Sequence, residues 1–391
     1  MRVVKTVKQN YSPTLEIIVL LEDFRHMVND CIRIGLETNV TSMKNLSRRT
    51  YHQLASYDLS TRYRLTANSK AAGILRNYRK TLKKNPSIKM PYAKKPMLTD
   101  CYGFKITNGQ LRLTLRPHEY VCISLNPHTL KSISGHTVRS IMLTTRTLSI
   151  NFSKETVEIE PAGLIGIDRN LDNVSLASSA RSTERFDFST ATETKAMYRE
   201  VKSYFKRNDA RVRKEIYSKY GAKQKDKVQQ ILHHASKQIV MQAKAKKFGI
   251  IMENLTGIRK LYRKGNGQGR EFRGRMNGWS YYELQRQIEY KARWEGLPVI
   301  YVNPSGTSVK CSRCGSRMAR IPEENRKLTC AKCGFNVDRD VNAARNILAR
   351  GLRFRPIASA SEAMVWESET DGNPSVDADE LTRRLTIEPT S

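Results

Sequence analysis

The sequence predicts a multidomain protein in which a β-rich part with inserted helices precedes an α/β domain with a small metal-binding insertion. Three observations lead to this prediction. The chain has 391 residues, which is long for one domain. Strand patterns occur before and after a helical block in the first 160 residues, and longer apolar strands follow from Pro161 onward. Two pairs of closely spaced cysteines interrupt the second part.

The charge balance of the chain indicates the class of its partner. It carries 69 Lys and Arg against 37 Asp and Glu, a formal net charge of +32. Such an excess repels itself in a compact fold, so we expect a polyanionic partner, with nucleic acid as the first candidate. The longest apolar stretch near the N-terminus, residues 17–21, is too short for a signal peptide or a membrane span. We therefore expect a soluble, cytoplasmic, nucleoid-associated protein with no membrane partner.

The N-terminal part is predicted to begin with a strand and continue with helices. Residues 1–20 are expected to open the chain as a strand, because V-V-K-T-V and I-I-V are rich in β-branched residues. Residues 21–87 follow a helical pattern, with apolar residues at helical spacing at Phe24, Met27, Cys31 and Ile34. A second helix is expected over residues 69–82 and ends before Pro86.

Residues 88–160 return to strand patterns. Two alternating segments around Asn108-Gly109 predict a β-hairpin, since this dipeptide suits a tight two-residue turn. Further strands are expected at residues 121–125, 138–143 and 148–152. Together with residues 1–20 they predict a small β-barrel or sandwich, interrupted in sequence by the helices.

The second domain is expected to cover residues 161–310 and 334–355. Two of its apolar strands end on an acid, at Asp168 and at Glu253, and long basic helices lie between them. The later elements are a Gly- and Arg-rich loop, a helix, a strand and a final helix, at residues 263–278, 279–294, 298–302 and 341–352. The loop is predicted to be either a mobile lid or a merely flexible connection.

Four cysteines form the pattern of a metal site, in which fifteen residues separate two C-x-x-C pairs: Cys311, Cys314, Cys330 and Cys333. This is the spacing of a four-cysteine zinc site, and a glycine follows each pair. Four thiolates fill the tetrahedral shell of Zn²⁺, so the predicted role of this ribbon, residues 311–333, is structural. The remaining cysteines are expected to be buried, reduced thiols: Cys31, Cys101 and Cys122.

Asp168, Glu253 and Asp340 are the candidate catalytic residues. Two lie at strand ends and the third at a predicted helix start, so their carboxylates can converge at one edge of a sheet. Such a group can hold two Mg²⁺ ions, which activate a water and stabilise the leaving oxygen of a phosphodiester. The order of strand, hairpin, helices, strand and acid-bearing helix is the order of an RNase H-like fold.

The last helix leaves one choice open. Asp338 competes with Asp340, because either could face the site while the other caps the helix. Asn342 and Asn346 share one helix face and could support a metal or a substrate. Spacing alone does not decide between the two acids.

Nucleic-acid contacts are expected from three regions. Residues 195–227 mix Lys and Arg with aromatic residues, which suit phosphates and unpaired bases. Near the predicted start of the second helix, the candidates for reading a short DNA motif are Tyr51, Asn68, Ser69 and Lys70. The arginines of the Gly- and Arg-rich loop are candidates for phosphate contacts: Arg263, Arg270 and Arg273.

Four motifs follow one another along the second domain. They are G-I-D-R-N, I-I-M-E-N-L, G-T-S-x-x-C-S-R-C-G and D-R-D-V-N-A-A-R-N-I-L, at residues 166–170, 250–255, 306–315 and 338–348. In sequence and order they resemble the TnpB family, transposon-encoded RNA-guided DNA endonucleases related to type V CRISPR effectors. The N-terminal part resembles that family in layout only.

This resemblance implies a RuvC nuclease domain with a catalytic triad, and it selects Asp340 over Asp338. It also implies a wedge β-barrel made of residues 1–20 and 88–160, into which residues 21–87 are inserted as a helical recognition lobe. The implied activity is Mg²⁺-dependent cleavage of double-stranded DNA beside a short target-adjacent motif. A guide RNA from the transposon end would direct it, with one or two copies of the chain on the RNA.

Two alternatives stay open. The first is a miniature type V CRISPR effector with the same chemistry, and the second is a non-cleaving, RNA-guided DNA-binding regulator. The intact set of acids argues against the second. Residues 356–391 hold eight acids and two bases, which predicts a disordered acidic tail, either inert or able to cover a basic groove.

Overall fold

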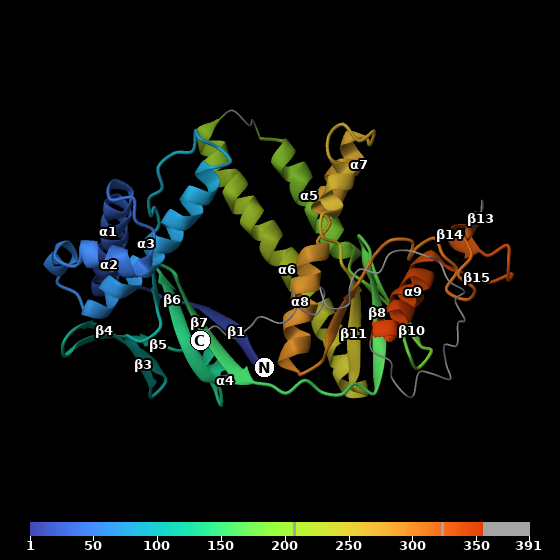
Figure 1. Cartoon of the computed structure of the whole chain (residues 1–391), viewed down its shortest axis with the longest axis horizontal. Coiled ribbons are helices and arrows are strands. Elements are labelled where there is room, and N and C mark those ends of the chain that lie inside the picture. Colours follow the sequence, from blue (N-terminus) through green and yellow to red (C-terminus); the bar gives the residue numbers. More distant parts are fainter. Residues whose placement is uncertain (206–208, 322–323, 355–391) are drawn as a thin grey trace. The chain divides into compact units, whose positions relative to one another are not determined.

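The computed structural model describes residues 1–205, 209–321 and 324–354 (Figure 1). The chain divides into two compact units, Met1–Thr156 and a second that begins at Val157. The predicted acidic tail, residues 356–391, lies outside the described residues. Within the described part of the chain, no helix is both long enough and apolar enough to cross a membrane.

The strands of the first unit form two antiparallel sheets. One has the order β1-β7-β6-β2, with bounds Arg2–Asn10, Thr147–Glu155, Thr137–Thr144 and Met97–Asp100. The other has the order β3-β4-β5, with bounds Phe104–Thr107, Gln110–Arg116 and Glu119–Ser124. The predicted hairpin joins β3 to β4 through Asn108 and Gly109, whose φ angles are 50° and 73°. Both sheets have open strand orders, and a closed barrel is not confirmed.

The helices of the first unit begin earlier in the chain than the sequence predicted. The main helices are α1, α2 and α3, with bounds Leu15–Glu37, Met43–Thr50 and Thr61–Leu82. The prediction of a strand over residues 1–20 was therefore wrong for its second half. Ile17, Leu20 and Phe24 are buried at helical spacing, and this pattern outweighs the β-branched residues around them.

Two short helices of the first unit were not predicted. They are η1 and α4, with bounds Gln53–Ser56 and Pro127–Ile133. The start of α4 follows known helix-start chemistry: the Asn126 side chain accepts a hydrogen bond from the Thr129 amide at 2.8 Å, and Pro127 occupies the first turn. The second predicted helix starts at Thr61 rather than near Ser69, which moves Ser69 from a helix start into its middle.

The second unit is organised around one five-stranded sheet with the order β10-β9-β8-β11-β12. The strands have bounds Thr183–Asp187, Asn173–Ser178, Gly163–Arg169, Phe248–Glu253 and Val299–Val302. The first three pair antiparallel, whereas β8, β11 and β12 pair parallel. Strand β10 was not predicted, because its sequence T-E-R-F-D is short and polar.

Side chains alternate between the two faces of this sheet, and helices cover both faces. Ile165 and Ile167 pack in one core cluster with residues of α6 and α8. Leu164 packs in a second cluster with Ala344 and Leu348 of α9, on the other side of the sheet (Figure 1). These three helices have bounds Ser218–Lys246, Tyr281–Trp294 and Arg339–Phe354. Asp168 lies four residues after Leu164 on the same strand, so its side chain points to the same face, the one that α9 covers.

Glycines allow α9 to lie directly on the sheet. A Cβ atom at Gly166 would come within 2.4 Å of the Ala344 carbonyl oxygen, and one at Gly351 would come within 2.1 Å of the Ile251 side chain. Larger side chains at these two positions would push the helix away from the strands. The close contact fixes the start of α9 over the strand ends that carry acids.

The remaining elements of the second unit connect or extend this core. Helix α5 and the π-helical η2 precede α6, with bounds Ser189–Ser203 and Val212–Tyr217. Three short strands form the ribbon sheet β13-β14-β15, with bounds Ala319–Ile321, Glu324–Thr329 and Asn336–Asp338. The predicted loop at 263–278 was wrong in part, since η3 (Ile258–Tyr262) precedes it and α7 (Arg270–Gly278) lies inside it. Its R-E-F-R-x-R-M segment consists largely of good helix formers around one glycine.

Candidate functional site

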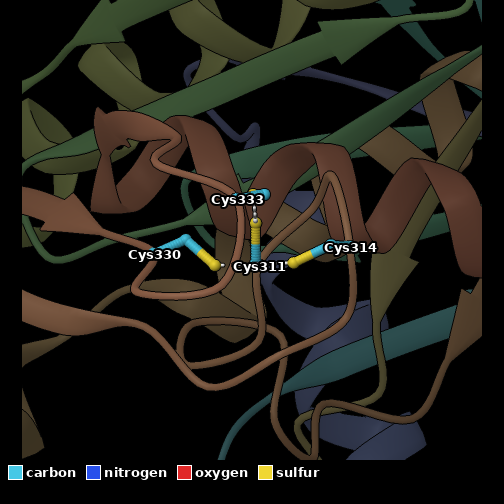
Figure 2. A group of neighbouring side chains, drawn as sticks. All are labelled: Cys311, Cys314, Cys330 and Cys333. Atoms are coloured by element: carbon cyan, nitrogen blue, oxygen red, sulfur yellow. Dashed lines mark hydrogen bonds between the residues drawn. The ribbon is translucent and has the colours of Figure 1, made fainter.

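The four predicted cysteines lie together in the ribbon (Figure 2). Their Sγ atoms all lie within 4.8 Å of one another. Cys311 Sγ is 3.8 Å from Cys333 Sγ, and Cys314 Sγ is 3.4 Å from Cys330 Sγ. A tetrahedral zinc ion with Zn–S bonds of about 2.3 Å sets neighbouring sulfurs about 3.8 Å apart. The cysteine cluster therefore has the donors and the size to hold a metal ion of this kind.

Each cysteine pair is shaped by the same backbone turn. The Gly315 amide donates to the Cys311 carbonyl at 2.9 Å, and the Gly334 amide donates to the Cys330 carbonyl at 2.9 Å. Both glycines have positive φ angles, 75° and 65°, which other residues adopt with strain. Each turn brings the two thiols of its pair close together.

The second group of candidate residues lies in a row across the α9 face of the main sheet. Arg185 on β10 pairs with Ser175 on β9, and Ser175 pairs with Asp168 on β8. Met252 pairs with Ile167, so Glu253 is the next residue of β11 and takes the place beside Asp168. Directly opposite residues of neighbouring strands point to the same face. The two predicted strand-end acids are therefore neighbours.

The start of helix α9 places Asp338 and Asp340 in different surroundings. Asp338 is the N-cap, because its Oδ1 accepts hydrogen bonds from the Asp340 and Val341 amides at 2.8 and 3.2 Å. Asp340 lies two residues after Asp338 and is only 2% exposed. The carboxylate of Asp340 lies close enough to Asp168 to raise the pKa of Asp168. The geometry thus favours Asp340 as the third member of the acid group.

Burial and mutual repulsion shape the electrostatics of the three acids. Asp168 and Glu253 are 7% and 8% exposed. Burial, then the charge of Glu253 and then that of Asp340, raise the pKa of Asp168 to about 7. Burial also raises the pKa of Glu253, opposed by a hydrogen bond of 2.5 Å from the Thr307 hydroxyl. Such a concentration of carboxylates is costly in isolation, and a bound divalent cation would relieve the cost.

Guanidinium groups already hold Asp340. Arg185 Nη2 donates to Asp340 Oδ2 at 2.9 Å, and Arg339 Nη2 donates to Asp340 Oδ1 at 3.2 Å. Arg169 instead donates to the main-chain carbonyl of Glu253 and is itself buried, which lowers its pKa to about 10. A pocket of about 400 Å³ opens beside Asp168 and Asp340, and the arginines among its lining residues are Arg317, Arg320 and Arg339. A polyanion that approached the acids through this pocket would meet positive charge.

The two asparagines of α9 do not reach the acids. Asn342 Nδ2 donates to the Lys310 carbonyl at 2.8 Å, and Asn342 Oδ1 accepts from the Ser312 amide at 2.9 Å. Asn346 Nδ2 donates to the carbonyls of Thr307 and Lys310, each at 2.7 Å. Both residues therefore fasten the entry to the ribbon onto α9.

The candidates for reading a DNA motif differ widely in exposure. Tyr51 is 62% exposed and Ser69 is exposed. Lys70 is half-buried and donates to the Met97 carbonyl at 2.5 Å. Asn68 is 1% exposed, and its Oδ1 accepts a hydrogen bond from Thr50 at 3.0 Å, so it is not presented at the surface. Because α3 starts at Thr61, these residues lie in the middle of the helix, where Asn68 faces inward and Ser69 faces outward.

The arginines of the predicted loop and the aromatic residues of the basic helices have mixed environments. Arg263 and Arg270 are exposed, whereas Arg273 is partly buried and donates to the Gln268 carbonyl. Among the aromatics, Tyr198 is buried but Tyr204 is 75% exposed. Only the exposed groups are free to meet a partner.

The prediction that all three isolated cysteines are buried was wrong for two of them. Cys31 is buried, and burial raises its pKa to about 12. Cys101 and Cys122 are exposed, since Cys101 lies beyond the end of β2 and Cys122 alternates outward on β5. Sequence reasoning also missed Ser175, which lies beside Asp168, and Arg185, which contacts Asp340; their places depend on the register of two antiparallel pairings.

Comparisons with known proteins agree with this arrangement. The model of the Cas12f1-like TNB domain family matches residues 281–347, which include the four cysteines and Asp340. A TnpB-like protein of Methanocaldococcus jannaschii is 37% identical over 155 residues, 40% of this chain and 54% of that protein. The resemblance to the TnpB family is confirmed. The CRISPR-associated endodeoxyribonuclease Cas12f1 of Sulfoacidibacillus thermotolerans is 39% identical over 120 residues, 29% of this chain and 25% of that protein.

The likeness to a Cas12f1 protein extends to the fold. A chain in a cryo-EM structure of a Cas12f1–sgRNA–target DNA complex matches with a TM-score of 0.61 at 16% identity, covering 85% of this chain and 82% of that one. In sequence, the chain matches about half the length of the TnpB-like relative and a quarter of the Cas12f1 relative. The structural match shows a shared α/β architecture.

Proposed function

We propose that this TnpB-like chain is an RNA-guided, Mg²⁺-dependent endonuclease that cleaves double-stranded DNA beside a short target-adjacent motif. The observation that carries the proposal is the convergence of Asp168, Glu253 and Asp340 on one face of the five-stranded sheet. A relative that bears the name endodeoxyribonuclease supports it, as does the net charge of +32. The guide RNA would come from the transposon end.

The three acids fit Mg²⁺ by their chemistry. Carboxylate oxygens are the ligands that Mg²⁺ takes from proteins, and the raised pKa of Asp168 and of Glu253 shows that ionisation is costly at this site, a cost that a bound cation would reduce. Two bound ions would supply water activation and stabilise the leaving oxygen of the phosphodiester. Asp168, Glu253 and Asp340 would hold these ions. Arg317 and Arg320, which line the pocket, would orient the phosphate backbone.

The cysteine cluster is proposed to hold one structural Zn²⁺. Its four ligands leave no coordination position for substrate, so it would not take part in the chemistry. The remaining domain assignments are also proposals: a wedge made of residues 1–20 and 88–160, a recognition lobe at 21–87 and a RuvC-like nuclease domain around the ribbon. Exposed residues suited to nucleic-acid contact are Tyr51, Ser69, Arg263 and Arg270.

The test is cleavage by protein purified with its co-expressed RNA. A plasmid library with a randomised segment beside the target should be cut when Mg²⁺ is present, and Asp168→Ala should abolish cutting. Binding of target DNA without cutting by the unmutated protein would support a regulator instead. The match to a Cas12f1-like domain keeps the miniature type V effector as a second candidate, and a CRISPR array beside the gene, in place of a transposon end, would favour it.

A further inference from the structure

Ser175 is a buried serine in the middle of the acid site. It is 1% exposed and lies on β9 directly opposite Asp168 in the antiparallel register. On its other side it pairs with Arg185 of β10. Ser175 therefore separates the arginine that holds Asp340 from the central acid of the site.

The face on which Ser175 lies follows from its neighbours along the strand. Val174 and Leu176 pack in the core cluster with α6 and α8, whereas Ala177 packs in the cluster with α9. Since side chains alternate along a strand, Ser175 shares the α9 face with Ala177 and with Asp168. Directly opposite Cβ atoms in an antiparallel pair are about 5 Å apart, which is within reach of a hydroxyl and a carboxylate.

The hydroxyl of Ser175 has no hydrogen-bond partner among the described residues. A buried donor without a partner is destabilising, whereas Ala177, two residues further along the same face of the strand, carries no polar group. The acids beside it have partners of their own: Asn170 Nδ2 donates to Asp168 Oδ2 at 3.1 Å, and two arginines hold Asp340. A buried hydroxyl beside these carboxylates is in place to donate to one of them once bound ions change the orientation of the carboxylates.

We propose that Ser175 is a positioning residue for the divalent ions of this site. In the ion-loaded protein its hydroxyl donates a hydrogen bond into the carboxylate cluster and holds Asp168 in the orientation that binds the ion. Asn170 restrains Asp168 from the turn side, and Ser175 restrains it from the neighbouring strand. The inference rests on the proposed function, because it requires divalent ions among the three acids. Groups that orient metal ligands typically change metal affinity about 10- to 100-fold when they are removed.

The experiment compares Ser175→Ala, Ser175→Thr and Ser178→Ala in the full-length protein. Ser178 lies on the same strand but pairs with Ser182, which makes Ser178→Ala a matched loss of one hydroxyl outside the acid row. The first readout is the Mg²⁺ concentration that gives half of the Mg²⁺-induced rise in Tm. The response of Asp168→Ala is subtracted, because it reports Mg²⁺ effects that do not arise at the acid site. The second is the Mg²⁺ dependence of DNA cleavage by the RNA-loaded protein.

We expect Ser175→Ala to raise the Mg²⁺ midpoint about 10-fold in both readouts, with cutting largely restored at saturating Mg²⁺. Its Tm without Mg²⁺ should be unchanged or higher, because the unpaired hydroxyl is gone. Ser175→Thr should restore the midpoint, and Ser178→Ala should leave it unchanged. The inference would be wrong, and the proposed function untouched, if Ser175→Ala kept the Mg²⁺ midpoint of the unmutated protein. The same holds if its only defect were a lower Tm without Mg²⁺. An unmutated protein with no Mg²⁺ response in either readout would overturn the proposed function, and the inference with it.

Discussion

Replacing Asp168 by Asn should stabilise the protein in Mg²⁺-free buffer at pH 8. The pKa of Asp168 is raised from 3.8 to about 7, first by burial and then by the charges of Glu253 and Asp340. A carboxyl with a raised pKa in the folded state opposes folding once it is ionised. The difference between the two pKa values corresponds to about 4 kcal/mol of destabilisation at pH 8.

The sign of the pH dependence follows from the two pKa values. Below about pH 4 the carboxyl is protonated in the folded and the unfolded chain, so its charge costs nothing. The cost grows as the pH rises from about 4 to about 7 and is constant above that. Asn is similar in size and can still accept the hydrogen bond from Asn170. Its new amide group needs a partner, however, and leaving that group unpaired would cancel about 1–3 kcal/mol of the stabilisation. The expected net gain at pH 8 is about 2 kcal/mol, or roughly 5 °C in Tm for a unit of this size.

The assay is thermal unfolding at pH 5 and pH 8 without Mg²⁺ and without chelator, so that the cysteine cluster keeps its metal. Asp338→Asn is the matched control, because Asn also caps helices well and Asp338 lies outside the buried group. The gain of Asp168→Asn should be clearly larger at pH 8 than at pH 5. If the Tm difference between Asp168→Asn and the unmutated protein were the same at both pH values, or if there were no gain at pH 8, ionisation of Asp168 would not destabilise the fold.

Three further predictions follow from the contacts of single residues. Cys330→Ser should release about one equivalent of zinc on purification, measured by metal analysis, because three thiolates bind far more weakly than four; full retention would contradict the zinc assignment. Asp340→Ala should abolish cutting and leave binding of guide RNA intact, whereas Asp338→Ala should keep cutting and lose about 1 kcal/mol of stability, measured by denaturant unfolding. The reverse pattern would make Asp338 the third acid. Arg185→Ala should lower the Mg²⁺ midpoint in the Tm assay severalfold, since it removes the cation that holds Asp340; a higher midpoint would mean that Arg185 helps the ions to bind.

The predictable parts of the site depended on local sequence. The cysteine turns need only their own glycines, and the hairpin at Asn108 needs only a two-residue turn. Likewise, Asp168 and Glu253 end apolar strands whose residues pair only with each other and with similar strands. The turns and the strand ends are determined by residues that are neighbours in the chain, whereas the contact between Asp168 and Glu253 also needs the pairing of β8 with β11.

The parts that could not be predicted depended on register and on competing signals. Ile17 and Val19 suit a strand by propensity, and only the helical spacing of the buried residues Ile17, Leu20 and Phe24 places the segment in a helix. Arg185 lies on a polar strand, so neither its element nor its neighbour Asp340 could be read from spacing. Cys122 sits among apolar residues, yet the pleat of β5 turns it outward. Long-range pairing decides each of these positions.

Helix α9 connects the ribbon to the acid site. Its first turn carries Asp340, and Asn342 and Asn346 hold the ribbon entry from the first and the following turn. That same entry segment carries Thr307, whose hydroxyl binds Glu253. A change in the ribbon can therefore reach one acid through Thr307 and another through the start of α9. The two proposed metal centres differ in chemistry, but they share one structural support, and loss of the ribbon's metal should disturb the acids even though no cysteine belongs to their group.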